Sequence, residues 1–245
     1  LVHDEAHLEP SFQELLESIV AAQHAAGDPR KLRVIELTAT NRPTTLNSAP
    51  PHTLTDDDRE RNDTVKERYN AVKQLSLTAL ADGEKLDVKL AALAKNRPDG
   101  RAVLIFTRSV ETALMVATEL DKGAHKGKVA MLTGTMRGKE RDELVTDNPV
   151  FQRFLPEKDP KGVPPASGTV FLVATSAGEV GVNLSADDLV CDLSTYDSMA
   201  QRFGRVNRFG KRKDTEIIVV HETKFDTEKP IESARERTLA PVSYT

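Results

Sequence analysis

Residues 169–184, TVFLVATSAGEVGVNL, join a short apolar run to a turn that is rich in glycine and small polar residues. The run at 169–175 has the length and the β-branched content of a buried strand. Further strands of this kind are expected at 101–107, 128–134, 188–194 and 215–222. Helical spacing of apolar residues predicts intervening helices at 84–96, 109–120 and 139–145. This alternation predicts an α/β fold in which a parallel sheet is covered on both faces.

The first fifty residues resemble part of another α/β unit. Residues 11–25 predict a helix with a capping-box pattern at Ser11 and Glu14. Its apolar side chains fall on one face, which we expect to be buried: Phe12, Leu15, Leu16, Ile19 and Val20. Residues 33–40, RVIELTAT, then predict a strand that runs into a turn of small residues.

The composition changes between these two regions. Residues 48–63 contain two prolines and then a run of charges without apolar periodicity, which predicts a surface loop or a linker between domains. We therefore expect a first domain at 1–47, a linker at 48–63 and a second domain at 64–222. Residues 155–168 are expected to form an exposed insertion, and 223–245 a polar tail that ends loosely.

The composition of the 245 residues limits the possible locations and partners. Cys191 is the only cysteine, so the chain has no internal disulfide, which favours a reducing, cytoplasmic compartment. No apolar run is as long as a membrane span, and no signal peptide is recognisable, so we expect no membrane contact. The net charge of −4 means that nucleic-acid binding would require a local basic patch.

Residues 201–213 hold the densest basic cluster of the chain. Arg202, Arg205 and Arg208 recur every three residues and are followed by three more basic residues at 211–213. A solvated basic helix end is one interpretation. The other is that guanidinium groups face a polyphosphate, which they bind in a bidentate fork. Ligands of open parallel sheets bind beyond the carboxyl ends of the strands, so we expect 107–109, 175–184 and 195–213 to meet at one edge.

Four segments in the same order resemble motifs II, III, V and VI of superfamily 2 helicases of the DEAH type. They are Asp4-Glu5-Ala6-His7, Thr38-Ala39-Thr40, residues 175–183 and residues 201–208. Residues 175–212 are also similar to the CRISPR-associated helicase of type I systems. The resemblance implies tandem RecA-like parallel-sheet domains, the first one incomplete. It also implies ATP-driven unwinding of target DNA, with single-stranded or partly unwound DNA and a guide-RNA surveillance complex as partners. The only His-Asp dipeptide, at His3-Asp4, overlaps the first motif, so we expect no HD-type nuclease centre here.

The resemblance also implies residue roles at the ATP site. Asp4 would hold Mg²⁺, and Glu5 would deprotonate the attacking water. Gln201, Arg205 and Arg208 would line the second face of the site, with the arginines as fingers. The remaining nucleotide-contacting positions implied by the motifs are His7, which would also couple the domains, Gly181, Asn183 and Arg202. Many relatives have aspartate where this chain has Asn183.

Further residues would contact nucleic acid or couple it to the nucleotide state. Thr38 and Thr40 would couple nucleotide state to domain closure, although a simple polar turn is the alternative. Arg108, Thr175 and Ser176 would touch the phosphate backbone without reading sequence, and Arg137 would face the strand as well. For Arg108, a surface charge without function is the competing interpretation.

No phosphate-binding loop of the form G-x-x-x-x-G-K-[ST] occurs in the sequence. We therefore expect the chain to begin inside the first motor domain, to need a missing N-terminal motor segment, and to hydrolyse no ATP alone. An RNA helicase of the same superfamily and a non-catalytic nucleic-acid-binding module remain open as alternatives.

Overall fold

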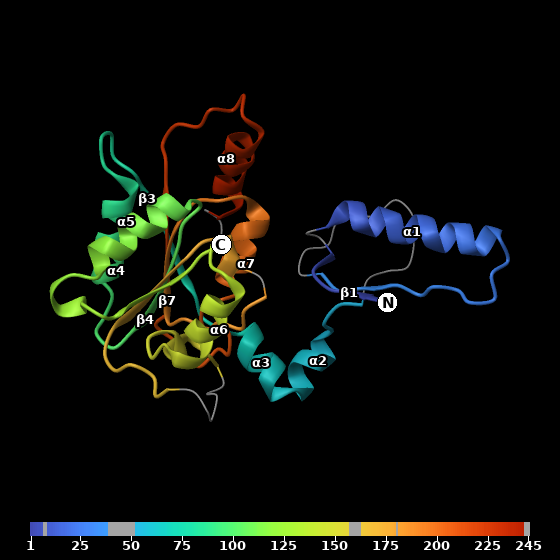
Figure 1. The fold of residues 1–245 in the computed structure, drawn as a ribbon, viewed down its shortest axis with the longest axis horizontal. Coiled ribbons are helices and arrows are strands. Elements are labelled where there is room, and N and C mark those ends of the chain that lie inside the picture. Colours follow the sequence, from blue (N-terminus) through green and yellow to red (C-terminus); the bar gives the residue numbers. More distant parts are fainter. Residues whose placement is uncertain (7–8, 39–51, 157–162, 180, 243–245) are drawn as a thin grey trace. The chain divides into compact units, whose positions relative to one another are not determined.

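The computed structural model describes residues 1–6, 9–38, 52–156, 163–179 and 181–242 (Figure 1). The chain divides into two compact units, Leu1–Thr53 and Leu54–Thr245, which are described separately. This division falls inside the segment 48–63. Within the described ranges, no helix combines the length and the apolar character that a membrane span requires.

The first unit contains one helix and two very short strands. Strand β1 (Val2–His3) pairs in parallel with β2 (Ile35–Glu36), and α1 (Pro10–Ala25) lies between them in sequence. The helix confirms the prediction at 11–25. The strand expected at 33–40 is reduced to two residues, and Thr40 lies outside the described residues.

Two details of the predicted helix are wrong. Glu9 is the N-cap and Pro10 occupies the first turn, so Ser11 lies inside the helix and its capping box does not form. Only Leu16 of the expected apolar face is buried, and the other four side chains are exposed: Phe12, Leu15, Ile19 and Val20. A pair of two-residue strands is too small to cover a helix of 16 residues.

The second unit is built on a six-stranded sheet in which every strand pair is parallel. The strand order is β3-β8-β7-β4-β6-β5. The strands are β3 (Gln74–Ala79), β4 (Ala102–Phe106), β5 (Val129–Leu132), β6 (Val170–Ala174), β7 (Asp188–Asp192) and β8 (Glu216–His221). Five of them were predicted. Strand β3 was not predicted. The sequence pattern that indicates it is the alternation of Leu75 and Leu77 with polar residues.

Helices cover both faces of this sheet, as predicted for a parallel α/β fold. Alternate strand residues point to opposite faces, so Val103 and Ile105 pack towards α4 (Leu86–Lys95) and α5 (Val110–Leu120). Leu104 and Phe106 pack on the other face, in a core with residues of α6 (Gly138–Asp147) and α7 (Tyr196–Phe203). Figure 1 shows α4 and α5 on one side of the strands and α7 on the other.

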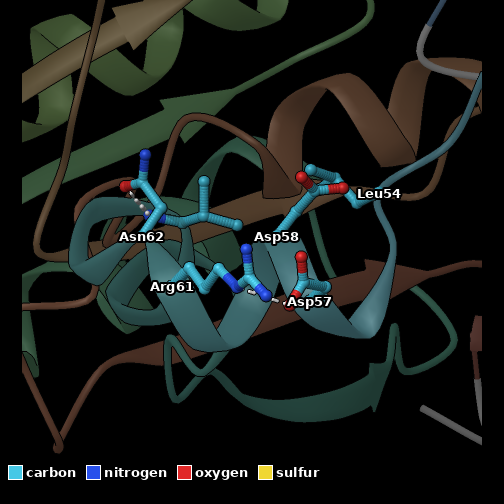
Figure 2. A pocket seen from close by; sticks show the side chains of 6 residues that line it. Leu54, Asp57, Asp58, Arg61 and Asn62 are labelled. Carbon is cyan, nitrogen blue, oxygen red and sulfur yellow. Dashed lines mark hydrogen bonds and ion pairs between the residues drawn. The ribbon is translucent and has the colours of Figure 1, made fainter.

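The segment predicted as linker is helical in its second half. Helix α2 (Asp56–Arg61) falls there and α3 (Asp63–Tyr69) begins at its last residue, whereas residues 48–51 lie outside the described residues. Thr55 and Asp58 form a capping box, and acidic residues in the first turn suit the positive helix N-terminus. A surface hollow beside these helices is lined by Leu54, Asp57, Asp58, Arg61, Asn62 and Val65 (Figure 2). Its charges are already satisfied, because Arg61 pairs with Asp57 at 2.7 Å and Asp58 bonds to Thr55.

The loose polar tail is also a wrong prediction. Residues Pro230–Val242 form α8, and Arg235 on this helix is only 1% exposed. Its guanidinium bonds to Glu232 and Glu222 and donates to the Leu193 carbonyl at 3.0 Å. The polar sequence therefore docks through the ion pairs of Arg235, with Leu239 packed against the core.

Gly210 allows α3 to approach the loop that follows α7. A Cβ atom at this position would lie 1.9 Å from the Glu67 carbonyl oxygen, and the backbone has φ +66°. Arg68 also stacks over the Phe209 ring, with 5.0 Å between the guanidinium carbon and the ring centroid. Glycine is therefore required both by space and by conformation.

We predict that Gly210→Ala destabilises the protein by about 2 kcal/mol or more, because α3 must shift away from the loop. Urea unfolding of the 245-residue protein measures the change. Gly134→Ala is the matched control, because that site has free space and no positive φ. Equal midpoints for the two variants would show that α3 does not pack as described.

Candidate functional site

Polar side chains gather where the central strands end. Arg108 follows β4, Thr175 follows β6, Asp192 ends β7 and Glu222 follows β8. Because these strands are parallel neighbours, their carboxyl ends share one edge of the sheet. The structure therefore brings together several residues that the sequence analysis singled out.

Arg202 of α7 is the central side chain at this edge and is only 1% exposed. Its Nε donates to Oε1 of Glu179 at 2.8 Å, and Nη1 donates to the Asp192 carbonyl at 2.8 Å and to its Oδ1 at 3.0 Å. Ser198 Oγ donates to the other carboxylate oxygen of Glu179 at 3.0 Å. Arg202 thereby ties α7 to the loop after β6 and to the end of β7.

The surroundings keep Arg202 charged. Burial opposes the charge, but Asp192 and Glu179 raise the pKa of Arg202 above its ordinary value. Its guanidinium also lies 5.2 Å from the centroid of the Phe106 ring. Gly178 leaves room for this ring, because a Cβ there would lie 3.1 Å from Phe106 Cε1 and 3.0 Å from the Ala174 Cβ.

Arg108 extends the network towards α8. Its backbone N–H and its Nε donate to Asp192 Oδ2 at 3.0 and 3.1 Å, and Nη2 donates to Glu222 Oε1 at 2.6 Å. Glu232 of α8 lies 3.7 Å from Nη1. Burial would raise the pKa of Glu222, but Arg108 and Arg235 hold it below its ordinary value. Carboxylates thus surround the guanidinium for which the sequence analysis predicted a phosphate contact.

Arg205, which was expected to be an arginine finger at the ATP site, is buried at 8% exposure. Its Nε donates to the Glu179 carbonyl at 3.0 Å and Nη1 to the Val182 carbonyl at 2.7 Å, and Nη2 also bonds to the Glu179 carbonyl. Arg205 therefore holds the backbone on both sides of Gly181, whose φ is +76°.

The end of the basic segment lies away from the strand ends. Helix α7 leads the chain back to the opposite edge of the sheet, where β7 begins. There Asn207 N donates to the Ala186 carbonyl at 2.9 Å, just before β7. Arg208 N lies 3.3 Å from Ser185 Oγ. The expectation that all of 195–213 gathers at the carboxyl edge is therefore wrong.

Asn207 is a structural residue that the sequence analysis missed. It is buried with φ +42°, a conformation that asparagine tolerates better than most residues. Its Nδ2 donates to the carbonyls of Val72 at 3.0 Å and Arg212 at 2.9 Å, and Oδ1 accepts from Arg212 N at 3.1 Å. The signal available in the sequence was an asparagine between Arg205 and Arg208 in a turn.

The basic cluster is not a continuous patch. Arg202 and Arg205 point into the protein, whereas Arg212 pairs with Asp187 at 3.5 Å and with Asp214 at 3.2 Å. Arg208 is half-buried, and no ion pair involves it within the described residues. Gln201 is half-buried as well.

The other predicted positions differ in exposure. Thr175 is buried and its N–H donates to the Leu132 carbonyl at 3.1 Å, whereas Ser176, Gly181 and Asn183 are exposed. Arg137 is exposed at the start of α6, where its backbone N–H donates to Glu140 at 2.9 Å.

The first unit holds the predicted acidic pair in a tight turn. Asp4 is exposed, and its Oδ1 accepts from the Glu5 N–H at 2.9 Å. Glu5 has φ +51°, which is rare for a residue other than glycine and is found at functional sites. Thr38 is exposed, whereas His7 and Thr40 lie outside the described residues. Within the part of the chain that the structure describes, no three His, Cys, Asp or Glu side chains could together hold a metal ion.

Residues 99–211 match the family model described as CRISPR-associated nuclease/helicase Cas3, C-terminal. The match contains the strand-end arginines and the loops that they hold. This segment is similar to the C-terminal helicase domain of that family, and the six-stranded parallel sheet has the RecA-like fold. The match agrees with the resemblance predicted from the sequence.

Solved structures of other proteins are also similar to this chain. Dbp5 of S. cerevisiae, bound to RNA and ADP BeF3, is 20% identical with a TM-score of 0.53, and the match covers 99% of this chain and 56% of that one. This likeness shows the RecA-like fold. Cas3 of T. fusca is 19% identical with a TM-score of 0.48, over 62% of this chain and 18% of that one.

A curated relative, DNA repair protein rad5 of Emericella nidulans, is 28% identical over 156 residues. The match covers 55% of this chain and 13% of the relative, so the chain spans a small part of that protein.

We predict that Arg202→Met destabilises the helicase domain by about 3–5 kcal/mol, because it leaves Asp192 and Glu179 buried without their partner. Arg212→Met removes the same charge from a more exposed pair and should cost at most about 1 kcal/mol. Urea unfolding of both variants measures the difference. Equal losses would contradict the assigned role of Arg202.

Proposed function

We propose that the protein is part of an ATP-dependent DNA helicase or translocase that unwinds target DNA in CRISPR-type defence. The observation that carries this proposal is the match of residues 99–211 to the Cas3 C-terminal family model. The charge network centred on Arg202 lies largely in that segment and orders two of its loops. A guide-RNA surveillance complex is the partner that we infer from the same match.

ATP and Mg²⁺ are the cofactors of this proposal, and the residues fit them. Mg²⁺ is held in proteins by one or two carboxylates together with substrate phosphates, and Asp4 offers an exposed carboxylate. Bound Mg²⁺ would neutralise charge on the phosphates. Glu5, next to it in a strained turn, accepts the proton of the attacking water. His7 and Gln201 have the proposed role of coupling ATP hydrolysis to nucleic-acid binding.

The arginines divide into two groups in this proposal. Arg208 faces the nucleotide phosphates, because its half-buried guanidinium has no carboxylate partner among the described residues. Arg205 would have to release the carbonyls of Glu179 and Val182 to reach a phosphate, so it chiefly orders the loop that holds Gly181 and Asn183.

Nucleic acid lies along the carboxyl edge of the sheet in this proposal. Ser176 and Arg137 are exposed and can donate to backbone phosphates without reading sequence. Thr175 is buried and supports the loop that carries Ser176. Thr38 and Thr40 have the proposed role of coupling nucleic-acid binding to the nucleotide state. Arg108 orients the edge through Asp192 and Glu222 rather than by contacting phosphate.

A helicase that acts on RNA is the second candidate, since the related Dbp5 was solved with bound RNA. The motifs contact phosphate and therefore do not distinguish the sugar. ATPase stimulation by single-stranded DNA and by RNA of equal length separates the two candidates, and no ATP turnover with either nucleic acid would favour a non-catalytic module.

We predict that Glu5→Gln lowers DNA-stimulated ATP turnover by about 10²–10⁴-fold while ATP binding is kept, because only the base is removed. The protein measured must include a G-x-x-x-x-G-K-[ST] loop, and the 245 residues alone serve as the inactive reference. Glu14→Gln, on the exposed surface of α1, is the charge-matched control. Near wild-type turnover of Glu5→Gln would exclude Glu5 as the base.

Arg208→Ala should lower turnover by about 10³-fold, the scale of an arginine finger, without changing the free energy of unfolding. Arg205→Ala should instead lower the free energy of unfolding by about 1–3 kcal/mol, because buried carbonyls lose their donors. Turnover assays and urea unfolding of both variants test this division. The reverse pattern would assign the finger to Arg205.

A further inference from the structure

The residues that precede β3 are fixed onto the loop after α7. Lys73 Nζ donates to the Phe203 carbonyl at 2.8 Å, and the Val72 carbonyl accepts from Asn207 Nδ2 at 3.0 Å. Arg208 follows Asn207 directly and is anchored by its own backbone next to Ser185. Lys73, which belongs to none of the helicase-like motifs, is thereby held against the segment that carries the arginine proposed to face ATP.

Lys73 and Arg208 differ from the buried cations that are paired with carboxylates. Arg101, Arg202 and Arg235 are of that kind. Lys73 and Arg208 are both half-buried, and neither forms an ion pair in the described part of the chain. Loss of solvent and then the charge of Arg208 lower the pKa of the Lys73 ammonium. Two like charges in such a place oppose each other, and an anion would remove that cost.

We propose that Lys73 and Arg208 bind one phosphate group of the nucleotide together. This inference rests on the proposed function and adds a second cation to it. The two side chains suit such a group differently, since guanidinium offers a planar fork and ammonium a compact charge with rotatable donors. The Phe203 carbonyl takes one donor of Lys73 and leaves two for phosphate oxygens.

Lys73 could bind an anion together with Arg208, or it could have a purely structural role, and the two roles can be distinguished. A lysine that only caps the end of α7 would stabilise the protein without any ligand. A lysine that is repelled by Arg208 would stabilise the protein mainly when the anion is bound. The two roles therefore predict opposite effects of removing the charge from the free protein.

The test uses the 245-residue protein, with sodium triphosphate as the probe and calorimetric titration at low ionic strength as the measurement. Lys73→Met and Arg208→Met should each weaken binding about tenfold to a hundredfold, the loss expected for one charge-assisted hydrogen-bonding group. Lys73→Arg should retain most of the affinity. Lys211→Met removes an exposed lysine from the same segment and should bind like wild type.

A double-mutant cycle tests whether the two residues share one phosphate. The double variant should bind more tightly than the sum of the single losses predicts, because each cation depends on the other. The melting temperature of Lys73→Met without triphosphate should equal or exceed that of wild type, and the shift caused by triphosphate should be smaller.

The failures of the two proposals are distinguishable. If Lys73→Met binds like Lys211→Met while Arg208→Met loses affinity, the pair is wrong and the arginine assignment stands. If Lys73→Met melts lower without ligand and keeps its affinity, Lys73 is only a helix cap. If Arg208→Met also binds like wild type, the proposed nucleotide contact of Arg208 fails as well.

Discussion

The buried guanidinium of Arg202 is the interaction on which the rest of this domain depends. A charge that is removed from water is tolerated only with close partners, and Arg202 finds them in Glu179 and Asp192. Glu179 belongs to the loop after β6, and Asp192 ends β7. Through Asp192 the same network reaches Arg108, Glu222 and α8. The network therefore sets the relative positions of three segments that are far apart in sequence.

This arrangement changes how the basic residues contribute to function. Most arginines in and around the helicase-like motifs are neutralised by carboxylates or bound to carbonyls, so they order loops rather than attract phosphate. Among the described residues, Lys73 and Arg208 are two half-buried cations without an acidic partner. Neutralised arginines thus build the scaffold, and the proposed anion site lies at Lys73 and Arg208.

The sheet could be predicted from the sequence because its central strands are continuous apolar runs, as in 101–107 and 169–175. Strand β3 was missed because only Leu75 and Leu77 alternate there. The helix at 10–25 was predicted, but the burial of its apolar face depends on neighbours that the sequence pattern does not describe. The roles of Arg108 and Arg205 could not be predicted either, because Glu222 and the carbonyl of Val182 reach them only after folding.

Native-state hydrogen exchange on the Glu179→Gln variant tests the central role of this network most directly. The change keeps the size of the side chain and removes one charge beside Arg202. The account predicts that amides of residues 175–179 and of α7 exchange faster together, by about tenfold to a hundredfold, while amides of β3 are unchanged. Faster exchange confined to the substituted position and its immediate neighbours, with α7 as protected as in wild type, would contradict it.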